Sequence, residues 1–532
     1  TAWSLTPHLA SSLFSAEFSS ILACLRLLHG VCADWKRWFS GSAAANWSDS
    51  PHWPCEKDFV SKKLSAKLTR QLQDVLIVCS GAIPPWWSFL LRECPFLIAL
   101  DVRYRYFRVT GLGLARSVQM FQPNSSDSTS HAAGHGSGDS GVRVNRLQRQ
   151  KVQLSRRRLL CSAVKALELP RAHTNVLEVE YFNEAGTGSG PTLEFFTLVS
   201  QALQQKGMGL FWGDAFVGAI GRKPRSAERG FTSHVPPSGL LFPAPLPAVE
   251  EDRRQVLSWW SFMGKFLGKA LQDERVVDFS WSAAWWRAVR GEVLGPEDLW
   301  DVDPQLQRQL LRLEQAAESG GALDGVTFEQ MELSYQIPAY PHVQLSRHPP
   351  DTLVTAGNVR AYCADVRFHV LSTEIVQQLE HFRRGFAAVF ELSALYPFGA
   401  NELCVLLQGK PEAWTLPLLQ SALTFDHGYS SDSLQAHWLI HILSTYSPAE
   451  QRDFLKFVTG SPRLPVGGLR NLKPKLTVVR KTSEGDQQAA TILPSVMTCT
   501  NYLKLPEYPS LECMQDRLHF AITEGQGCFH LS

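Results

Sequence analysis

The sequence lacks a surplus of charge of either sign. It contains 52 lysine and arginine residues and 50 aspartate and glutamate residues, which gives a formal net charge of +2 over 532 residues. A protein that binds nucleic acid mainly by neutralising phosphates needs a clear basic excess. We therefore expect protein partners and no nucleic-acid partner.

Paired cysteines are also missing. The 11 cysteines are scattered, with no C-x-x-C pair and no cysteine–histidine spacing typical of zinc sites. A secreted domain held together by disulfides would be shorter and denser in cysteine. We therefore expect a reducing compartment (the cytoplasm, the nucleus or both), no metal site, and mostly buried thiols with one reactive exception.

No secretory signal and no uninterrupted apolar span are present. The sequence starts T-A-W, without a charged leader or an initiator methionine, which predicts a fragment of a longer protein. The apolar stretch of residues 13–31 is interrupted by Glu17 and Arg26. It predicts an amphipathic helix and not a membrane span, so we expect no membrane partner.

What is present is an ordinary globular composition, with 44% hydrophobic and 19% charged residues. Residues 1–121 form a first block rich in tryptophan and leucine, a predicted helical extension. Helices are predicted over 19–28 and 64–72, and strand-like content over 99–109. Residues 122–142 are almost wholly small and polar, which predicts a disordered linker.

A long, mainly helical block follows over 143–424. Its basic opening, residues 143–158, fits a solvated helix face better than a nuclear-import or phosphate-binding patch, because leucines alternate with the charges. The glycine-rich stretch 186–190 lacks the lysine of a phosphate loop and predicts a tight turn. The block's clearest elements are a strand over 177–181 and helices over 192–205, 254–274 and 373–390.

The sequence pattern changes after residue 425, where short predicted strands and helices alternate. This pattern predicts a small α/β domain over 425–532 and, with the helical block, an α+β fold. The predicted helices cover 434–445, 448–457 and 511–523, and the predicted strands cover 476–479 and the end of 497–505.

Cys499 differs from the other cysteines in its surroundings. It lies in L-P-S-V-M-T-C-T-N-Y-L-K-L-P, residues 493–506, where polar neighbours and bracketing prolines predict an exposed loop. No adjacent histidine is available as a base, which counts against a papain-like protease. Thioester exchange needs only an accessible thiol. Five others have the apolar neighbours of small buried hydrophobes: Cys24, Cys79, Cys161, Cys363 and Cys404.

The segment around Cys499 resembles the nucleophile loop of HECT ubiquitin ligases, whose pattern is L-P-x-x-x-T-C-x-N-x-L-x-L-P. Phe529 lies fourth from the end of the chain, as a phenylalanine does in that family. Further matches are F-x-T-G-x-x-R-x-P at 457–465, a hallmark helix at 262–271, V-T-x-x-N-x-x-x-Y at 354–362 and G-F at 385–386.

Within this family the chain resembles the ubiquitin-fusion-degradation subgroup, which includes plant trichome-branching ligases. The resemblance covers most of residues 56–532 and includes G-T-G-x-G-P-T-L-E-F at 186–195 and G-S-P-R-L-P-V-G-G at 460–468. Many HECT ligases carry a histidine two residues before the nucleophile, where this chain has Met497. The resemblance therefore does not imply an imidazole that activates Cys499.

The resemblance implies a bilobal HECT domain, with a large helical N-terminal lobe over 143–424 and a small catalytic lobe over 425–532. A subdomain around 305–350 is expected to dock a ubiquitin-conjugating enzyme. Rotation between the lobes brings distant sulfur atoms together, and a glycine is suited to absorb it. The hinge is expected at Asp426, His427 and Gly428.

The same resemblance implies a HECT-type E3 ubiquitin transferase. Cys499 would accept ubiquitin as a thioester from the conjugating enzyme and pass it to a substrate lysine, promoting protein degradation. No cofactor is needed, because the thioester carries the chemical energy. Thr498 and Asn501 are expected to shape the loop and help hold the developing oxyanion. Arg463 is expected to support transfer by its charge near the loop, and Phe529 by anchoring the tail or simply by core packing.

Two other functions stay open at this point. The first is a non-catalytic interaction protein with a degenerate HECT fold, although the intact flanks of Cys499 speak against it. The second is a cysteine hydrolase, which would need one of the C-terminal histidines against Cys499: His427, His437, His441, His519 or His530.

The role of residues 1–121 also stays open. They either bind substrate or brace the larger lobe.

Overall fold

The computed structural model describes residues 15–38, 56–74, 77, 80–113, 116–117, 147–170, 173–184, 188–214, 234–319, 322–345, 349, 351–482 and 489–524. The predicted linker over 122–142 lies outside these residues. The chain forms two compact units. The first consists of Thr1–Gln148, Arg287–Asp298 and Phe390–Ala400, and the second of Arg149–Trp286, Leu299–Val389 and Asn401–Ser532.

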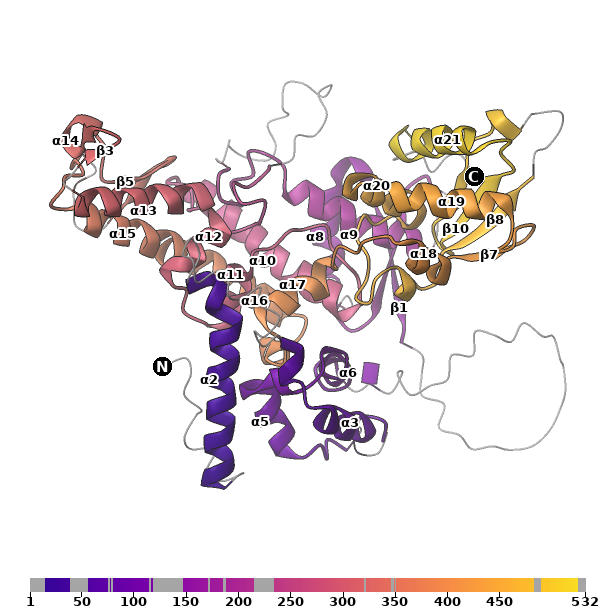
Figure 1. Cartoon of the computed structure of the whole chain (residues 1–532), viewed down its shortest axis with the longest axis horizontal. Helices are drawn as coiled ribbons and strands as arrows, with labels where there is room; N and C mark the ends of the chain where they lie inside the picture. Colours follow the sequence, from indigo (N-terminus) through magenta and orange to yellow (C-terminus); the bar gives the residue numbers. More distant parts are fainter. Residues whose placement is uncertain are drawn as a thin grey trace. The chain divides into compact units, whose positions relative to one another are not determined.

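The first unit is helical where it is described. Leu68, Trp87 and Ile98 are fully buried in its core, where they pack with Leu22. Its helices, drawn in indigo and violet in Figure 1, are α2 (Ala16–Trp38), α3 (Lys62–Gln71), α5 (Pro85–Glu93) and α6 (Leu100–Thr110). Helix α6 overturns the predicted strand over 99–109. Its aromatic content suggested a strand, but the buried residues Val102, Arg103 and Phe107 follow helical spacing.

Later parts of the chain complete this unit. The Arg103 guanidinium donates a 2.7 Å hydrogen bond to the carbonyl oxygen of Pro397. The Phe107 ring lies with its centroid 5.5 Å from that of Phe390 and 5.6 Å from that of Phe398. The helical extension is therefore not the contiguous stretch 1–121, because its buried side chains use partners that are remote in sequence.

Helix α2 carries apolar side chains on more than one face. Leu22 is buried, whereas Ile21, Leu27 and Leu28 are about half exposed. Its window Ala16–Ala33 has a mean hydropathy of 1.3 and is 11% buried, so by length and composition alone it could cross a membrane. Core helices of soluble proteins and signal sequences pass the same test, so this feature is weak evidence.

The second unit begins with two parallel strands, β1 (Arg149–Leu154) and β2 (Val176–Tyr181). The strand predicted over 177–181 is confirmed, but the helix face predicted for the basic opening is wrong. Strand β1 points Val152 and Leu154 into the core. Its Lys151 lies outside and pairs with Glu180 of β2 at 3.2 Å. The basic residues thus face acidic partners on the neighbouring strand.

We call residues 149–286, 299–389 and 401–408 the helical block. The three helices predicted in this region are confirmed as α9, α10 and α16. Apart from α13 and α14, which belong to the subdomain described below, the helices wholly or partly in this region are α8 (Leu159–Glu168), α9 (Ser189–Leu203), α10 (Glu250–Gln272), α11 (Ala283–Arg290), α12 (Leu299–Val302), α15 (Val359–Leu371), α16 (Val376–Ala387) and α17 (Ala400–Gln408).

Helices α10 and α16 lie side by side at the centre of this block (Figure 1). They approach so closely that a Cβ atom at Gly264 would overlap the carbonyl oxygen of Phe382. A Cβ atom at Gly385 would likewise overlap the carbonyl oxygen of Ser261. Glycine is the only residue that allows this backbone contact.

A small subdomain projects from the helical block around residues 305–350. Its helix α13 packs along α15, and short antiparallel pairs β3–β4 and β5–β6 follow it. The elements are α13 (Pro304–Glu318), β3 (Ala322–Leu323), β4 (Val326–Thr327), α14 (Phe328–Met331), β5 (Gln336–Ile337) and β6 (Tyr340–Gln344).

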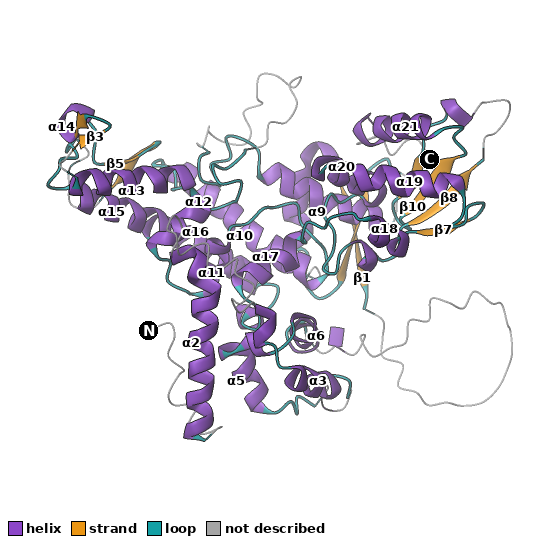
Figure 2. Cartoon of the chain, in the orientation of Figure 1, coloured by secondary structure: helices purple, strands orange, loops and turns teal. Residues whose placement is uncertain are grey.

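The C-terminal block, residues 414–524, is built around a four-stranded sheet in the order β7-β8-β10-β9. Figure 2 shows this sheet in orange with α19 and α21 beside it. The strands are β7 (Thr424–Asp426), β8 (Thr477–Lys481), β9 (Ser495–Met497) and β10 (Tyr502–Pro506). The helices are α18 (Leu416–Ala422), α19 (Leu434–Thr445), α20 (Pro448–Thr459) and α21 (Leu511–Glu524).

This block begins earlier than the predicted boundary at residue 425. Trp414 and Leu419 share one buried core with Leu443, Val478 and Leu503. Helix α18 packs against α19, and β7 pairs in parallel with β8. The boundary therefore moves to a point before residue 414, because apolar side chains of α18 need this core. The predicted helices over 434–445, 448–457 and 511–523 are confirmed.

Candidate functional site

Cys499 lies in a hairpin turn at one end of the C-terminal sheet. Strands β9 and β10 pair antiparallel, with Met497 opposite Tyr502, so four residues form the turn between them. Strand β10 lies between β8 and β9, and its Leu503 and Leu505 are fully buried. A turn anchored on an inner strand has little freedom, so the sheet fixes the position of the thiol.

Asn501 holds the turn from within. Its φ of 52° is in the left-handed region, which asparagine tolerates better than most residues, and its side chain is buried. The side-chain amide of Asn501 donates a 2.7 Å hydrogen bond to the carbonyl oxygen of Pro474, and the backbone carbonyl oxygen of Asn501 accepts one from the Thr477 backbone amide at 3.0 Å. Asn501 thus shapes the loop by ordering its backbone.

The first turn of α9 contacts the Cys499 loop from the helical block. The Ser189 hydroxyl donates a 3.0 Å hydrogen bond to the carbonyl oxygen of Cys499. A Cβ atom at Gly190 would overlap the Thr498 hydroxyl, and one at Gly188 would lie 3.6 Å from the Cys499 Cβ. Residues 188–190 of the predicted glycine-rich turn are therefore the surface on which the candidate nucleophile rests, and 186–187 lie outside the described residues.

Cys499 is half-buried, and its thiol is free. Three other described thiols are unsuited to attack. Burial raises the pKa of Cys94, Cys363 and Cys404 to about 12, so these groups stay protonated near neutral pH. Access therefore separates Cys499 from Cys94, Cys363 and Cys404. The expectation that Cys24 and Cys161 are buried is wrong, because both are exposed.

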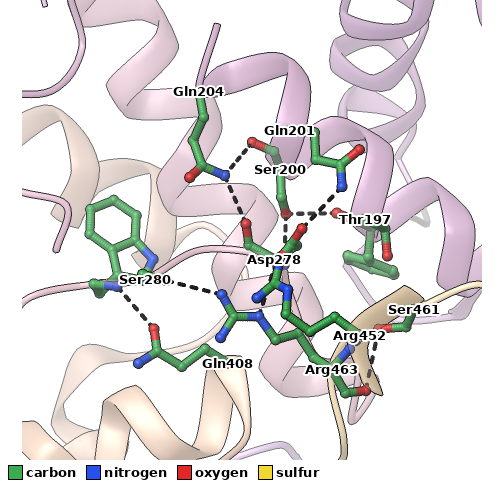
Figure 3. A network of polar contacts seen from close by, with 12 residues as sticks. Thr197, Ser200, Gln201, Gln204, Asp278, Ser280, Gln408, Arg452, Ser461 and Arg463 are labelled. Carbon is green, nitrogen blue, oxygen red and sulfur yellow. Dashed lines mark hydrogen bonds and ion pairs between the residues drawn. The ribbon is translucent and has the colours of Figure 1, made fainter. Parts of the chain in front are cut away.

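A second contact between the blocks centres on Asp278, as Figure 3 shows. One carboxylate oxygen accepts hydrogen bonds from Arg463 at 2.9 Å and from Arg452 at 3.0 Å. Arg463 also donates to the Ser280 hydroxyl at 3.0 Å. Burial alone would raise the pKa of Asp278, but the charges of Arg452 and Arg463 and the hydrogen bonds hold it below its usual range.

The structure corrects the expected position of Arg463. Its guanidinium is engaged by Asp278 and Ser280 and not by the Cys499 loop. Asp278 is bonded to Gln201 near the end of α9, whereas the loop contacts Ser189 at its start. Twelve residues of helix separate these contacts, which corresponds to about 18 Å along the axis. Arg463 therefore pairs with the buried carboxylate of Asp278 and does not contact the Cys499 loop.

The expected hinge residues lie inside the C-terminal block. Asp426 ends β7, and the carbonyl oxygen of His427 accepts a 3.2 Å hydrogen bond from the Arg480 amide of β8. Gly428 has a φ of 100° beside the Arg480 side chain. The connection between the blocks is formed instead by residues 409–413, and rotation at Gly428 stays a prediction. Phe529 lies outside the described residues.

The sequence does not by itself predict three residues of these contacts. Ser189 lies inside a glycine motif that predicts only a turn, and Asp278 is a lone acidic residue in an apolar run. That isolation was the available signal, since a buried charge needs partners. Nothing in the sequence indicates that Arg452 forms a contact, because charged residues on a helix face are usually solvated.

No histidine among the described residues donates a hydrogen bond to the Cys499 thiol or accepts one from it, and His530 lies outside the described ranges. Over the same part of the chain, no group of three or more histidine, cysteine or acidic side chains could hold a metal ion. An accessible thiol on an ordered turn is suited to attack an activated carbonyl carbon.

Comparison with known proteins agrees with this chemistry. Residues 197–532 match the family described as HECT-domain (ubiquitin-transferase). The chain is 38% identical over 516 residues to the E3 ubiquitin-protein ligase UPL3 of Arabidopsis thaliana, a match that covers 89% of this chain and 27% of that protein.

Two further relatives extend the match. The E3 ubiquitin-protein ligase TRIP12 of Danio rerio is 35% identical over 545 residues, covering 98% of this chain and 26% of that protein. The ubiquitin fusion degradation protein 4 of Saccharomyces cerevisiae is 34% identical over 486 residues, covering 89% and 32%. The chain spans about a quarter to a third of the length of these relatives.

Proposed function

The chain belongs to the HECT-domain (ubiquitin-transferase) family, and on this premise we propose that it acts as an E3 ubiquitin-protein ligase with Cys499 as the nucleophile. The observation that carries the proposal is the Cys499 turn, anchored on an inner strand and resting on the first turn of α9. The substrates are lysine side chains of other proteins.

The chemistry consists of two acyl transfers. In the first, the Cys499 sulfur attacks the carbonyl carbon that joins ubiquitin to the cysteine of a conjugating enzyme. A new C–S bond forms, the old C–S bond breaks, and the departing sulfur takes up the proton that Cys499 releases. Because one thioester replaces another, the step is nearly neutral in free energy and needs no cofactor.

In the second transfer, the uncharged amine of a substrate lysine attacks the same carbonyl carbon. A C–N bond forms, the C–S bond to Cys499 breaks, and the proton lost by the amine returns to the sulfur. Holding the thioester in one orientation lowers this barrier. Asn501 and Ser189 serve this purpose, since both fix backbone atoms of the turn. Thr498, which lies against Gly190, is proposed to help hold the oxyanion.

We assign the helical block to the N-terminal lobe of a bilobal HECT domain and the C-terminal block to its catalytic lobe. The subdomain that contains α13 and β3 to β6 is the proposed docking surface for the conjugating enzyme. It lies at the opposite end of the helical block from α9 (Figure 1). Transfer between such distant sites requires the C-terminal block to move, with residues 409–413 and Gly428 as the proposed flexible points.

Single-turnover loading tests the proposal. The chain is mixed with activating enzyme, conjugating enzyme and labelled ubiquitin, and the products are separated on non-reducing gels. We compare the wild type with Cys499→Ala, Cys499→Ser and the control Cys513→Ala, which removes another free, partly buried thiol of the same block. The expected adduct is thiol-sensitive in the wild type and the control, absent in Cys499→Ala, and thiol-resistant in Cys499→Ser, where an ester forms.

Other outcomes separate the alternatives. An adduct that survives in Cys499→Ala would put the nucleophile at another residue. No adduct with any of several conjugating enzymes would favour a non-catalytic interaction protein. Release of free ubiquitin without transfer to lysine would favour a hydrolase.

We further propose that the activity promotes degradation of the modified protein in the cytoplasm or nucleus. The name of the yeast relative, ubiquitin fusion degradation protein 4, supports the role in degradation. The eight described cysteines, all free thiols, fit the cytoplasm or nucleus. Comparing substrate half-lives with and without Cys499→Ala in cells tests the role in degradation.

A further inference from the structure

Residues of the helical block hold Asp278 in place independently of the two arginines. Its amide donates to the Ser200 hydroxyl at 3.3 Å, and its carbonyl oxygen accepts a 2.7 Å hydrogen bond from Gln204. The second carboxylate oxygen accepts one from Gln201 at 3.0 Å. The side chain is buried. A carboxylate fixed in this way presents one oxygen in a set direction, as Figure 3 shows.

The C-terminal block meets this oxygen with two arginines from separate segments. Arg452 comes from the middle of α20, and Arg463 from the loop that follows it. Arg463 is mostly buried, whereas the Arg452 side chain is 45% exposed. Two arginines bound to one carboxylate restrict rotation of the C-terminal block more than a single ion pair would, because they attach the block at two separate positions.

Helix α9 connects this contact with the nucleophile. Ser189, Thr197 and Gln201 follow one another along the helix at steps of eight and four residues, and their side chains spread over about 120° around its axis. Ser189 donates to Cys499, Thr197 donates a 3.2 Å hydrogen bond to the carbonyl oxygen of Gly460, and Gln201 holds Asp278. The C-terminal block thus lies along α9, with Cys499 at one end of the contact and the arginines at the other.

We propose that Asp278 is a positioning residue for the transfer of ubiquitin to lysine. By binding Arg463 and Arg452 it holds the C-terminal block along α9, so that the Cys499 loop stays on the first turn of the helix. The inference rests on the proposed function and adds to it a residue whose contact with α9 lies about 18 Å along the helix axis from the contact of the Cys499 loop. Asp278 acts through the seating of the block and touches no reacting atom.

The proposal predicts that the two transfers respond differently. Loading requires Cys499 to reach a conjugating enzyme docked elsewhere, so the block must leave its seat on α9. Discharge to lysine uses the seated arrangement, and its observed rate scales with the fraction of molecules that are seated. Loss of the Asp278 charge therefore lowers discharge and leaves loading unchanged or faster.

The test follows the half-reactions separately in the whole chain. Each variant is loaded with labelled ubiquitin, further charging is stopped, and decay of the adduct is followed after addition of free lysine. Asp278→Asn keeps the shape and removes the charge. We expect loading within about twofold of the wild type and discharge to lysine about tenfold slower. Glu507→Gln is the control, since it removes one charge from an ion pair with Arg480 inside the C-terminal block.

A double-mutant cycle separates positioning from direct chemistry. If Arg463 acts through Asp278, Asp278→Asn combined with Arg463→Gln discharges no more slowly than the slower single variant. Independent, multiplying effects of the two changes would instead mean that Arg463 has a role of its own at the thioester, and the proposal would be wrong. Discharge by hydroxylamine reports the reactivity of the thioester itself and should stay at the wild-type rate in Asp278→Asn.

A second variant keeps the test decisive if Asp278→Asn lowers the unfolding midpoint. Arg452→Gln alters a half-exposed side chain and leaves Arg463 in place, so we expect normal loading and discharge about threefold slower. Wild-type discharge in both variants would overturn the proposal. Absence of any adduct on wild-type Cys499 would instead overturn the proposed function, and the two failures are therefore distinct.

Discussion

Gly190 and Thr498 come from different blocks of the molecule and lie so close together that a Cβ atom on the glycine would be 2.9 Å from the threonine Cβ and would overlap its hydroxyl. The contact leaves room only for a hydrogen atom. The seating of the Cys499 loop on α9 is therefore sensitive to a single methyl group.

Replacing Gly190 by alanine tests this contact. The added methyl group pushes the loop off α9 while the helix itself accepts alanine readily, so we expect normal loading of Cys499 and discharge to lysine about tenfold slower. Single-turnover gels measure both rates. Gly357→Ala is the control, because its Cβ would meet only the Thr355 hydroxyl at 3.8 Å. Normal discharge in Gly190→Ala would contradict the seated arrangement.

Ser189→Ala removes the one hydrogen bond that α9 donates to the Cys499 backbone. A neutral hydrogen bond contributes about 0.5–1.5 kcal/mol, which corresponds to roughly 2–12-fold slower discharge. Loading should not change, since it does not use this contact. Ser258→Ala, which removes an exposed hydroxyl within α10, is the matched control. Equal loss of both rates would point to misfolding and not to the lost contact.

Gly385→Ala should act on folding instead of on one reaction step. Its methyl group would overlap the carbonyl oxygen of Ser261 where α10 and α16 touch, with backbone on both sides and no side chain able to yield. We expect a loss of about 1–3 kcal/mol or more in the free energy of unfolding. Urea unfolding followed by circular dichroism measures this loss. A midpoint equal to the wild type would show that the helices can separate at little cost.

Asn501→Ala combines two penalties in the nucleophile loop. Alanine is strained at a φ of 52°, and the carbonyl oxygen of Pro474 loses its donor. We expect the free energy of unfolding of the C-terminal block to fall by about 2–4 kcal/mol. Asn501→Gly relieves the backbone strain, so its loss should be about half as large. Comparing the unfolding and loading rates of both variants separates the two causes.

The ion pairs of Asp278 also predict a dependence of stability on pH. The folded protein holds the pKa of Asp278 below the ordinary value of 3.8. A carboxyl with a lowered folded pKa contributes stability above the unfolded pKa and loses it as pH falls through the folded pKa. The wild type should therefore be more stable than Asp278→Asn from about pH 5 to 7, and the difference should shrink below about pH 4. Urea midpoints across this range measure it, and a constant difference would argue against the pairing.

Local patterns predicted much of the C-terminal block. The helix over 434–445 matches α19 at both ends, because Ser433 precedes it and apolar residues recur at helical spacing. The Cys499 loop was recognisable because threonine and asparagine flank the thiol and prolines bracket it. The predictions failed where tertiary partners decide, as in α6, whose Phe107 packs on rings from a distant segment.

The contacts between the helical block and the C-terminal block could not be predicted from the sequence for the same reason. Arg463 and Asp278 are 185 residues apart, and Ser189 and Cys499 are 310 apart. Nothing in the spacing of either pair indicates that the residues meet. The nucleophile was therefore predictable from its own segment, whereas the surface that positions it was not.

The first unit has a consequence for synthesis on the ribosome. Arg103 of α6 is bonded to Pro397, 294 residues further along the chain. At a translation rate of 5–20 residues per second, that partner emerges roughly 15–60 s after the arginine. During this interval the Arg103 guanidinium has its local partner Ile98 but lacks Pro397, and the Phe107 ring lacks Phe390 and Phe398. The N-terminal helices are therefore synthesised first but reach their final packing late, which makes this stretch a natural client for a chaperone while translation continues.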